Sequence, residues 1–232
     1  MKIFNPLHFV ACALCGLVFV SLSLGFDFKK DWLGQKDKNK TVGAVSDANV
    51  LYCFFSDNFL LGDYPYNYPH DKSKLQIDAK VLKNGDASLR FDLDPDTFSG
   101  GAICLYKRVI DAKSYLKKGA VQFWIKGAMG GEVAWISLID DDSDKKKTVV
   151  RLPINRYGDI NKEWTFLSIP LKDFTRVEPC FWDSTLQREI PYEFNWERVA
   201  EFRIESKKKE NKSFRIWVDD ICIVKKQKKN PS

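Results

Sequence analysis

The chain has 232 residues, a formal net charge of +6 at neutral pH and 14% aromatic residues. This length is enough for one sizeable domain together with a targeting segment. Its two histidines are His8, near the N-terminus, and His70. A multi-histidine metal site is therefore excluded, and the commonest general base is almost absent.

Residues 1–25 have the pattern of a signal peptide. Lys2 precedes an apolar run over residues 7–26, and Ser23 and Gly25 supply the small residues of a signal-peptidase site. The run is nearly long enough to span a bilayer, so an uncleaved membrane anchor is the alternative. In either case we expect the main domain to lie outside the cytoplasm, whether secreted, periplasmic or anchored by this segment.

The next part of the chain divides into a linker, a domain and a tail. Residues 26–48 are rich in Lys, Asp and Asn with little periodicity, which is typical of a linker. Residues 49–225 form the predicted domain, and residues 226–232 a basic tail. The strands predicted in the domain are residues 50–55, 74–81, 87–93, 102–108, 119–126, 132–139, 148–153, 164–170, 199–205 and 214–224.

Many short strands without intervening helices indicate an all-β fold, a two-sheet antiparallel β-sandwich of the jelly-roll kind. One long segment, residues 172–197, interrupts the rhythm and is predicted to be irregular. Loops of this length are uncommon unless they bind something.

The last predicted strand shows the alternation most clearly. Phe214, Ile216 and Val218 lie on one face, and the residues between them on the other. Asp219 and Asp220 then interrupt the apolar pattern. Because an unpaired buried carboxylate is costly, we expect one of them to lie at an edge, to hold a cation, or to bind a loop.

Four cysteines follow the targeting segment: Cys53, Cys104, Cys180 and Cys222. In an exported chain they permit two disulfides, with three possible connectivities. The alternative is four buried thiols that behave as small apolar side chains.

Lysines cluster at residues 145–147, 207–209 and 225–229. We interpret these clusters as solvated turns that protect strand edges, and a patch for a polyanion or a membrane surface is the alternative. No aromatic residues interleave with the lysines, so we expect no nucleic-acid partner.

Five phrases then occur in a characteristic order. They are Gly100-Gly101-Ala102, residues 120–127, residues 164–174, residues 199–204, and Val218-Asp219-Asp220-Ile221. Over residues 49–224 this succession resembles the family 11 carbohydrate-binding modules and the related galactose-binding-like domains attached to β-glucan hydrolases. The resemblance implies a galactose-binding-like jelly roll that binds glycan across a concave sheet face and has no catalytic role.

The resemblance also implies ligand-binding residues. Arg176 and Glu178 lie in the long segment, where the family has polar residues lining the cleft, and Trp182 would supply an aromatic platform. Arg151 and Arg203 are placed on strands and alternate with apolar residues.

For the two arginines, ordinary cross-strand ion pairs with Glu201 or Glu205 are the alternative. The tryptophans at positions 124, 135, 164 and 217 are expected to pack in the core or between the sheets.

A structural calcium ion is a further implication, because Asp219 matches the acid of the family's last strand. The first strand, residues 51–55, lacks the acids that the family has there, so Asp57 or backbone carbonyls would have to compensate. Alternatively, if the first and last strands are neighbours, Cys53 and Cys222 would form a disulfide across the seam that the ion holds in relatives.

The sequence therefore predicts a non-catalytic, exported carbohydrate-binding domain, with a polysaccharide such as β-glucan as its ligand. The alternative is an extracytoplasmic structural or protein-interaction domain that binds an envelope protein. A membrane contact is expected only through an uncleaved N-terminal segment. Two carboxylates could in principle serve a glycosidase, but the resemblance argues against an enzyme.

Overall fold

The computed structural model describes residues 48–60, 62–141, 147–207 and 214–226. The chain divides into two compact units, Met1–Thr41 and Val42–Ser232, and the described residues all belong to the second. The predicted targeting segment, nearly all of the predicted linker and tail, and most of each lysine cluster lie outside the described residues. Within the part described, no helix has the length and apolar character needed to cross a membrane.

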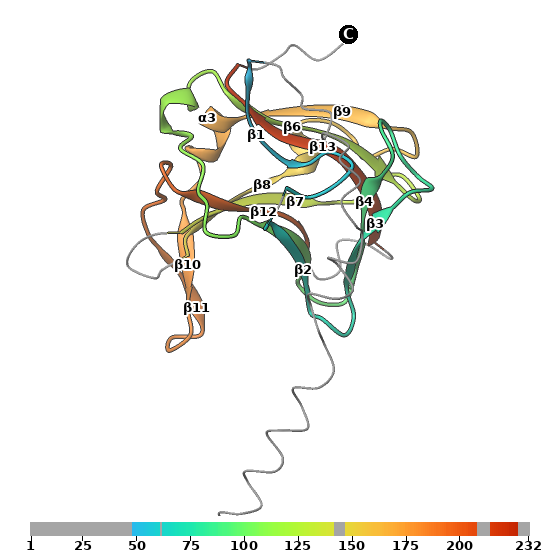
Figure 1. Ribbon diagram of the computed structural model, residues 1–232. Coiled ribbons are helices and arrows are strands. Elements are labelled where there is room, and N and C mark those ends of the chain that lie inside the picture. Colours follow the sequence, from blue (N-terminus) through green and yellow to red (C-terminus); the bar gives the residue numbers. More distant parts are fainter. Residues whose placement is uncertain (1–47, 61, 142–146, 208–213, 227–232) are drawn as a thin grey trace, which may run out of the picture. The chain divides into compact units, whose positions relative to one another are not determined.

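The described strands form two antiparallel sheets that lie face to face (Figure 1). The six-stranded sheet has the order β3-β4-β13-β6-β9, and β1 also pairs with β13. Its strands are β1 (Val50–Phe55), β3 (Lys74–Asp78), β4 (Ser88–Leu93), β6 (Ala120–Gly127), β9 (Thr165–Pro170) and β13 (Phe214–Val224).

The seven-stranded sheet has the order β11-β10-β8-β7-β12-β5-β2. Its strands are β2 (Tyr64–Tyr68), β5 (Ser99–Cys104), β7 (Trp135–Asp140), β8 (Val149–Pro153), β10 (Cys180–Asp183), β11 (Arg188–Pro191) and β12 (Val199–Ser206). Helical structure among the described residues is limited to three short elements: α3 (Leu171–Phe174) and two 3-10 turns, Lys113–Tyr115 and Ile154–Arg156. The predicted all-β sandwich is confirmed.

The core lies between the two sheets because strand side chains alternate from face to face. Phe123 and Ile125 of β6 and Phe202 and Ile204 of β12 are all fully buried there. The largest buried side chains include several further phenylalanines, Phe54, Phe55, Phe91 and Phe174.

The first and last strands are neighbours. This is the condition for the Cys53–Cys222 disulfide that was the predicted alternative to a calcium ion. Along one edge of β13, β4 pairs with its first half and β1 with its second half. Cys53 lies opposite Cys222 in this pairing, and the two form a disulfide. The predicted pairing of these cysteines is therefore confirmed, while Cys104 and Cys180 remain free thiols.

The segment predicted to be irregular, residues 172–197, contains regular structure. The helix α3 opens it, and β10 and β11 form an antiparallel hairpin in which Trp182 pairs with Glu189. Four-residue strands are too short to show a clear alternation of apolar and polar residues, so no periodic pattern predicts them. In Figure 1 this hairpin and β2 bend away from the six-stranded sheet at the two ends of the other sheet, whose outer face is therefore concave.

Candidate functional site

The concave outer face of the seven-stranded sheet is built around β12. Phe202 and Ile204 point into the core, so Glu201, Arg203 and Glu205 point outward. Both carboxylates are nevertheless almost inaccessible, with exposed fractions of 1% and 0%. Buried carboxylates require partners, and here those partners come from strands on both sides of β12.

Two tyrosines of β2 reach across β5 to these carboxylates. Tyr66 donates its hydroxyl to Glu201 and Tyr68 donates to Glu205, each over 2.6 Å. The Tyr68 bond depends on Gly100 of the intervening strand, because a Cβ at that position would lie 2.3 Å from the Tyr68 hydroxyl oxygen.

This geometry explains an error in the predicted strand boundaries. The strand predicted over residues 102–108 begins earlier, because Gly100 and Gly101 both lie inside β5. Tyr68 covers Gly100 on the outer face, and a Cβ on Gly101 would meet the Phe91 ring at 2.7 Å on the inner face. Glycines inside a strand are typical of such close approaches.

Arg203 completes the arrangement on β12. Its guanidinium pairs with Glu201, lies 4.0 Å from Glu205, and lies 5.8 and 5.5 Å from the centroids of the Tyr66 and Tyr68 rings. Burial, followed by the charges of the glutamates, raises the pKa of both tyrosines. Burial alone would raise the pKa of Glu201, but Arg203 and hydrogen-bond donors outweigh it and lower that pKa.

Arg151 of β8 connects this arrangement to the β10–β11 hairpin. Its Nη1 lies 2.6 Å from a Glu189 carboxylate oxygen, and its Nε lies 3.3 Å from Glu205. Its guanidinium also lies 5.6 Å from the centroid of the Phe98 ring, which in turn contacts Tyr68. A continuous row of aromatic and charged groups therefore runs across the sheet from β2 to the hairpin.

Several aromatic side chains on this face are open to solvent. The exposed fractions are 58% for Trp182, 44% for Phe98 and 42% for Tyr64. Trp135 of β7 is half-buried on the same face, with the Lys207 ammonium 3.4 Å from its ring centroid. Exposed aromatic rings beside paired charges suit a ligand with both apolar faces and hydroxyl groups.

The structure separates the five residues predicted to bind ligand. Trp182, Arg151 and Arg203 share the concave face. Arg176 lies after α3, largely exposed, with its guanidinium 3.4 Å from the Asp173 carboxylate. Glu178 lines a separate cavity and does not belong to the row described above. The expected ion pairs are present, Arg151 with Glu205 and Arg203 with Glu201, and both arginines also lie on this face.

The expectation that the tryptophans pack in the core or between the sheets is wrong for Trp124, Trp135 and Trp217. Trp124 and Trp217 face outward from the six-stranded sheet, because their immediate neighbours occupy the inner face. Trp124 contacts the Phe166 ring at 5.1 Å. Trp135 lies on the concave face, and Trp164 is half-buried just before β9. Sequence reasoning thus missed Trp135 and Phe98, although the strand alternation around Trp135 could have revealed it.

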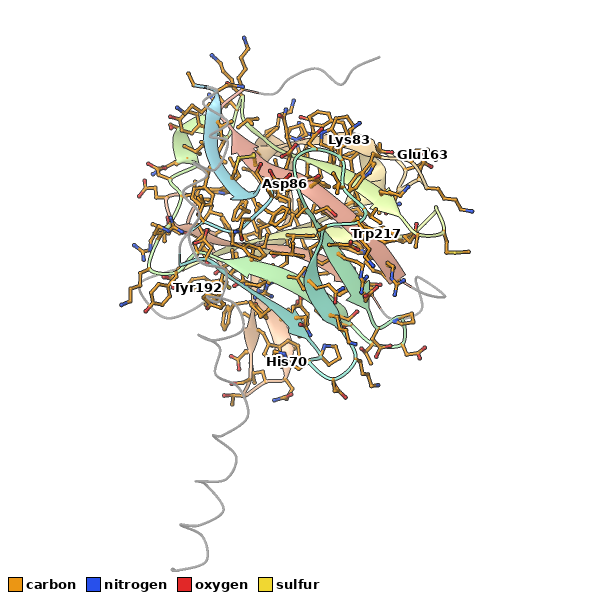
Figure 2. The ribbon with its side chains drawn as sticks, turned by 45° about the vertical axis from the view of Figure 1, so that its right-hand side comes forward. His70, Lys83, Asp86, Glu163, Tyr192 and Trp217 are labelled. Atoms are coloured by element: carbon orange, nitrogen blue, oxygen red, sulfur yellow. A yellow bond between two sulfur atoms is a disulfide. The ribbon has the colours of Figure 1, made fainter. Side chains whose placement is uncertain are left out.

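Asp219 anchors a loop. One carboxylate oxygen accepts hydrogen bonds from the backbone N–H groups of Lys83 and Asn84, both at 3.1 Å, and the other accepts from Asp220 at 2.8 Å. Figure 2 shows Lys83 at this loop. Both carboxylate oxygens of Asp219 are therefore already hydrogen-bonded to backbone N–H groups.

Among the residues that the structure describes, no group of three or more His, Cys, Asp or Glu side chains is arranged to hold a metal ion. The donor set around Asp219 does not fit a calcium site.

Comparison with known proteins identifies the class of module. The sequence profile of carbohydrate binding domain 30 matches residues 52–225, so the chain belongs to this family. It is a non-catalytic carbohydrate-binding domain, which confirms the kind of module that the sequence resemblance indicated, with family 30 as the matching family. No curated protein sequence matches the chain.

Solved structures agree on the fold. The crystal structure of a family 30 carbohydrate-binding module is similar with a TM-score of 0.62 and 21% identity, over 78% of this chain and 90% of that one. The family 30 module of a cellulosomal cellulase from Clostridium thermocellum is similar with a TM-score of 0.56 and 21% identity, over 74% of this chain and 95% of that one.

Proposed function

We propose that the chain binds a neutral β-glucan across the concave face of the seven-stranded sheet. The observation that carries this proposal is the row in which the exposed rings of Trp182 and Phe98 flank the ion pair of Arg151 and Glu189. Sugar rings present apolar C–H faces to aromatic rings and hydroxyls to charged groups. The similar module from a cellulase makes β-glucans the first class to test.

The length of the row suits a chain of several sugar rings. From β10 to β5 the sheet crosses four strand spacings, or roughly 19 Å. Trp182 lies at one end, on the projecting hairpin, and Phe98 at the other. Arg203 contacts Glu201 and Glu205. In this proposal Arg203 holds these two glutamates in position and does not itself bind the sugar.

Affinity electrophoresis in gels containing barley β-glucan, hydroxyethyl cellulose, laminarin or xylan tests this proposal. We expect retardation by at least one β-glucan and a loss of at least tenfold in affinity for Trp182→Ala. Leu186→Ala is the matched control, because Leu186 is a similarly exposed apolar residue, 54% accessible, between the same two strands. No retardation by any of the four polysaccharides, or equal retardation of Trp182→Ala and wild type, would overturn the proposal.

Export from the cytoplasm belongs to the same proposal, because polysaccharides of this class lie outside the cell. Residues 1–25 would direct it, by cleavage or as an anchor. A reporter fused after Ser232 should be active only if it functions outside the cytoplasm. Activity of a strictly cytoplasmic reporter would contradict export.

A further inference from the structure

A second concavity lies at the edge of the sandwich, near the base of the β10–β11 hairpin. Two adjoining cavities, of about 240 and about 310 Å³, share Pro179 and Glu193 as lining residues. We call them together the edge groove. Their other lining residues are Val150, Phe174, Thr175, Val177, Phe194 and Trp196 in the first, and Glu178, Pro191 and Tyr192 in the second.

The edge groove is distinct from the concave face. Val150, which lines its first cavity, lies between Val149 and Arg151 on β8 and belongs to the core that fills the space between the sheets. This cavity therefore opens at the rim of the sandwich and not on the outer face of the sheet.

Two chain segments, 174–179 and 191–196, form the walls. They are joined where the N–H of Tyr192 donates to the carbonyl of Pro179 over 3.0 Å. Tyr192, Phe194 and Trp196 are spaced by two residues, and all three are half-buried. The rings of Phe194 and Trp196 have centroids 4.6 Å apart, and Tyr192 packs edge-on against Phe181 at 5.5 Å.

The charged side chains that line the edge groove are acidic. Glu178 and Glu193 are exposed, and among the described residues neither carboxylate pairs with a basic side chain. Unpaired carboxylates repel anionic ligands and accept hydrogen bonds from hydroxyl groups. Aromatic walls with an acidic rim therefore fit a neutral, hydroxyl-rich ring better than a phosphate, a uronic acid or a fatty chain.

We propose that the edge groove is a second glycan site, which binds another segment of the neutral polysaccharide held on the concave face. This inference rests on the proposed function. Pro179 lies three residues before Trp182, roughly 10 Å along an extended strand, so both sites are carried by the same hairpin. Because a polysaccharide repeats the same unit, two linked sites raise its affinity through effective concentration.

Calorimetric titration with cellohexaose and with laminarihexaose tests the second site. Wild-type protein should bind two equivalents of one of these hexasaccharides, and Tyr192→Ala and Trp182→Ala should each bind one. Each substitution should also weaken binding to the polymer at least tenfold, whereas Leu186→Ala should change neither quantity. Glu193→Lys, at an exposed position where the fold is not at risk, should remove the same equivalent as Tyr192→Ala.

The possible failures are distinguishable. A single equivalent that Trp182→Ala abolishes and Glu193→Lys leaves intact would overturn the second site while supporting the concave face. A single equivalent lost in Tyr192→Ala and Glu193→Lys but not in Trp182→Ala would support the edge groove and overturn the concave face. Absence of binding to both hexasaccharides and to all four polysaccharides would overturn both proposals.

Discussion

Tyr68 and Glu205 are joined by a hydrogen bond that passes directly over Gly100, from one strand to the next but one. Glu205 is fully buried, and it also accepts a hydrogen bond from Ser137 over 2.5 Å. Bonds between distant parts of the chain thus hold the β2 side of the concave face together, while the rings of Phe98 and Tyr64 stay exposed beside them.

The close approach at Gly100 predicts a large effect of a single methyl group. Gly100→Ala should force Tyr68 away from Glu205 and lower the free energy of unfolding by about 1–3 kcal/mol. Tyr68→Phe should cost a similar amount, and the double variant should cost less than the sum because both changes break the same bond. Urea denaturation of the four proteins checks this, and strict additivity would contradict the coupling.

The Cys53–Cys222 disulfide predicts a response to reductant and not to chelator. It joins two residues 169 positions apart in the sequence, so its removal should lower the free energy of unfolding by about 2–5 kcal/mol. Thermal unfolding should shift downward in dithiothreitol and in Cys53→Ala/Cys222→Ala. EDTA should leave it unchanged, because Asp219 already accepts backbone hydrogen bonds. A downward shift in EDTA would instead reveal a bound metal ion.

The lowered pKa of Glu201 predicts acid sensitivity. A carboxyl whose pKa is lower in the folded state than in the unfolded chain stabilises the fold above its ordinary pKa of 4.5. That contribution is lost as the pH falls through the folded-state pKa. The free energy of unfolding of wild type should therefore fall below about pH 4.5, and more steeply than that of Glu201→Gln, when both are measured by urea denaturation between pH 7 and pH 3. Parallel curves for the two proteins would rule out this role.

The opposite orientations of Phe123 and Trp124 predict unequal costs of truncation. Phe123 is fully buried between the sheets, so Phe123→Ala should cost about 3–5 kcal/mol. Trp124 is half-buried on the outer surface beside Phe166, so Trp124→Ala should cost about 1 kcal/mol. Equal destabilisation in urea would mean that Trp124 packs inside.

Local patterns predicted most of the fold. The strand over residues 214–224 and the first strand are at their predicted positions, because alternation over six or more residues is a strong signal. The pairing of Cys53 with Cys222 followed once these strands were taken as neighbours. The hairpin β10–β11 was missed because its strands are short, and β2 because it carries a proline at Pro65.

The candidate site was less predictable, because its residues meet through contacts distant in sequence. Tyr68 and Glu205 are 137 positions apart, and no local pattern links them. Trp182 and Arg151 came from the family resemblance, whereas Phe98 lies outside any strand and gave no periodic signal. The outward direction of Trp124 follows from its apolar neighbours Phe123 and Ile125, and this local alternation is a better guide than the average preference of tryptophan for the interior.

The seam between β1 and β13 also determines how the domain carries force. The chain crosses into and out of the sandwich at one point, where Asn49 and Lys225 share a backbone hydrogen bond of 2.7 Å. Tension applied through the flanking segments would reach the Cys53–Cys222 bond after a few residues and pass through it covalently. Residues 54–221 would then bear no load, so the sandwich would keep its binding faces while the chain on either side is stretched.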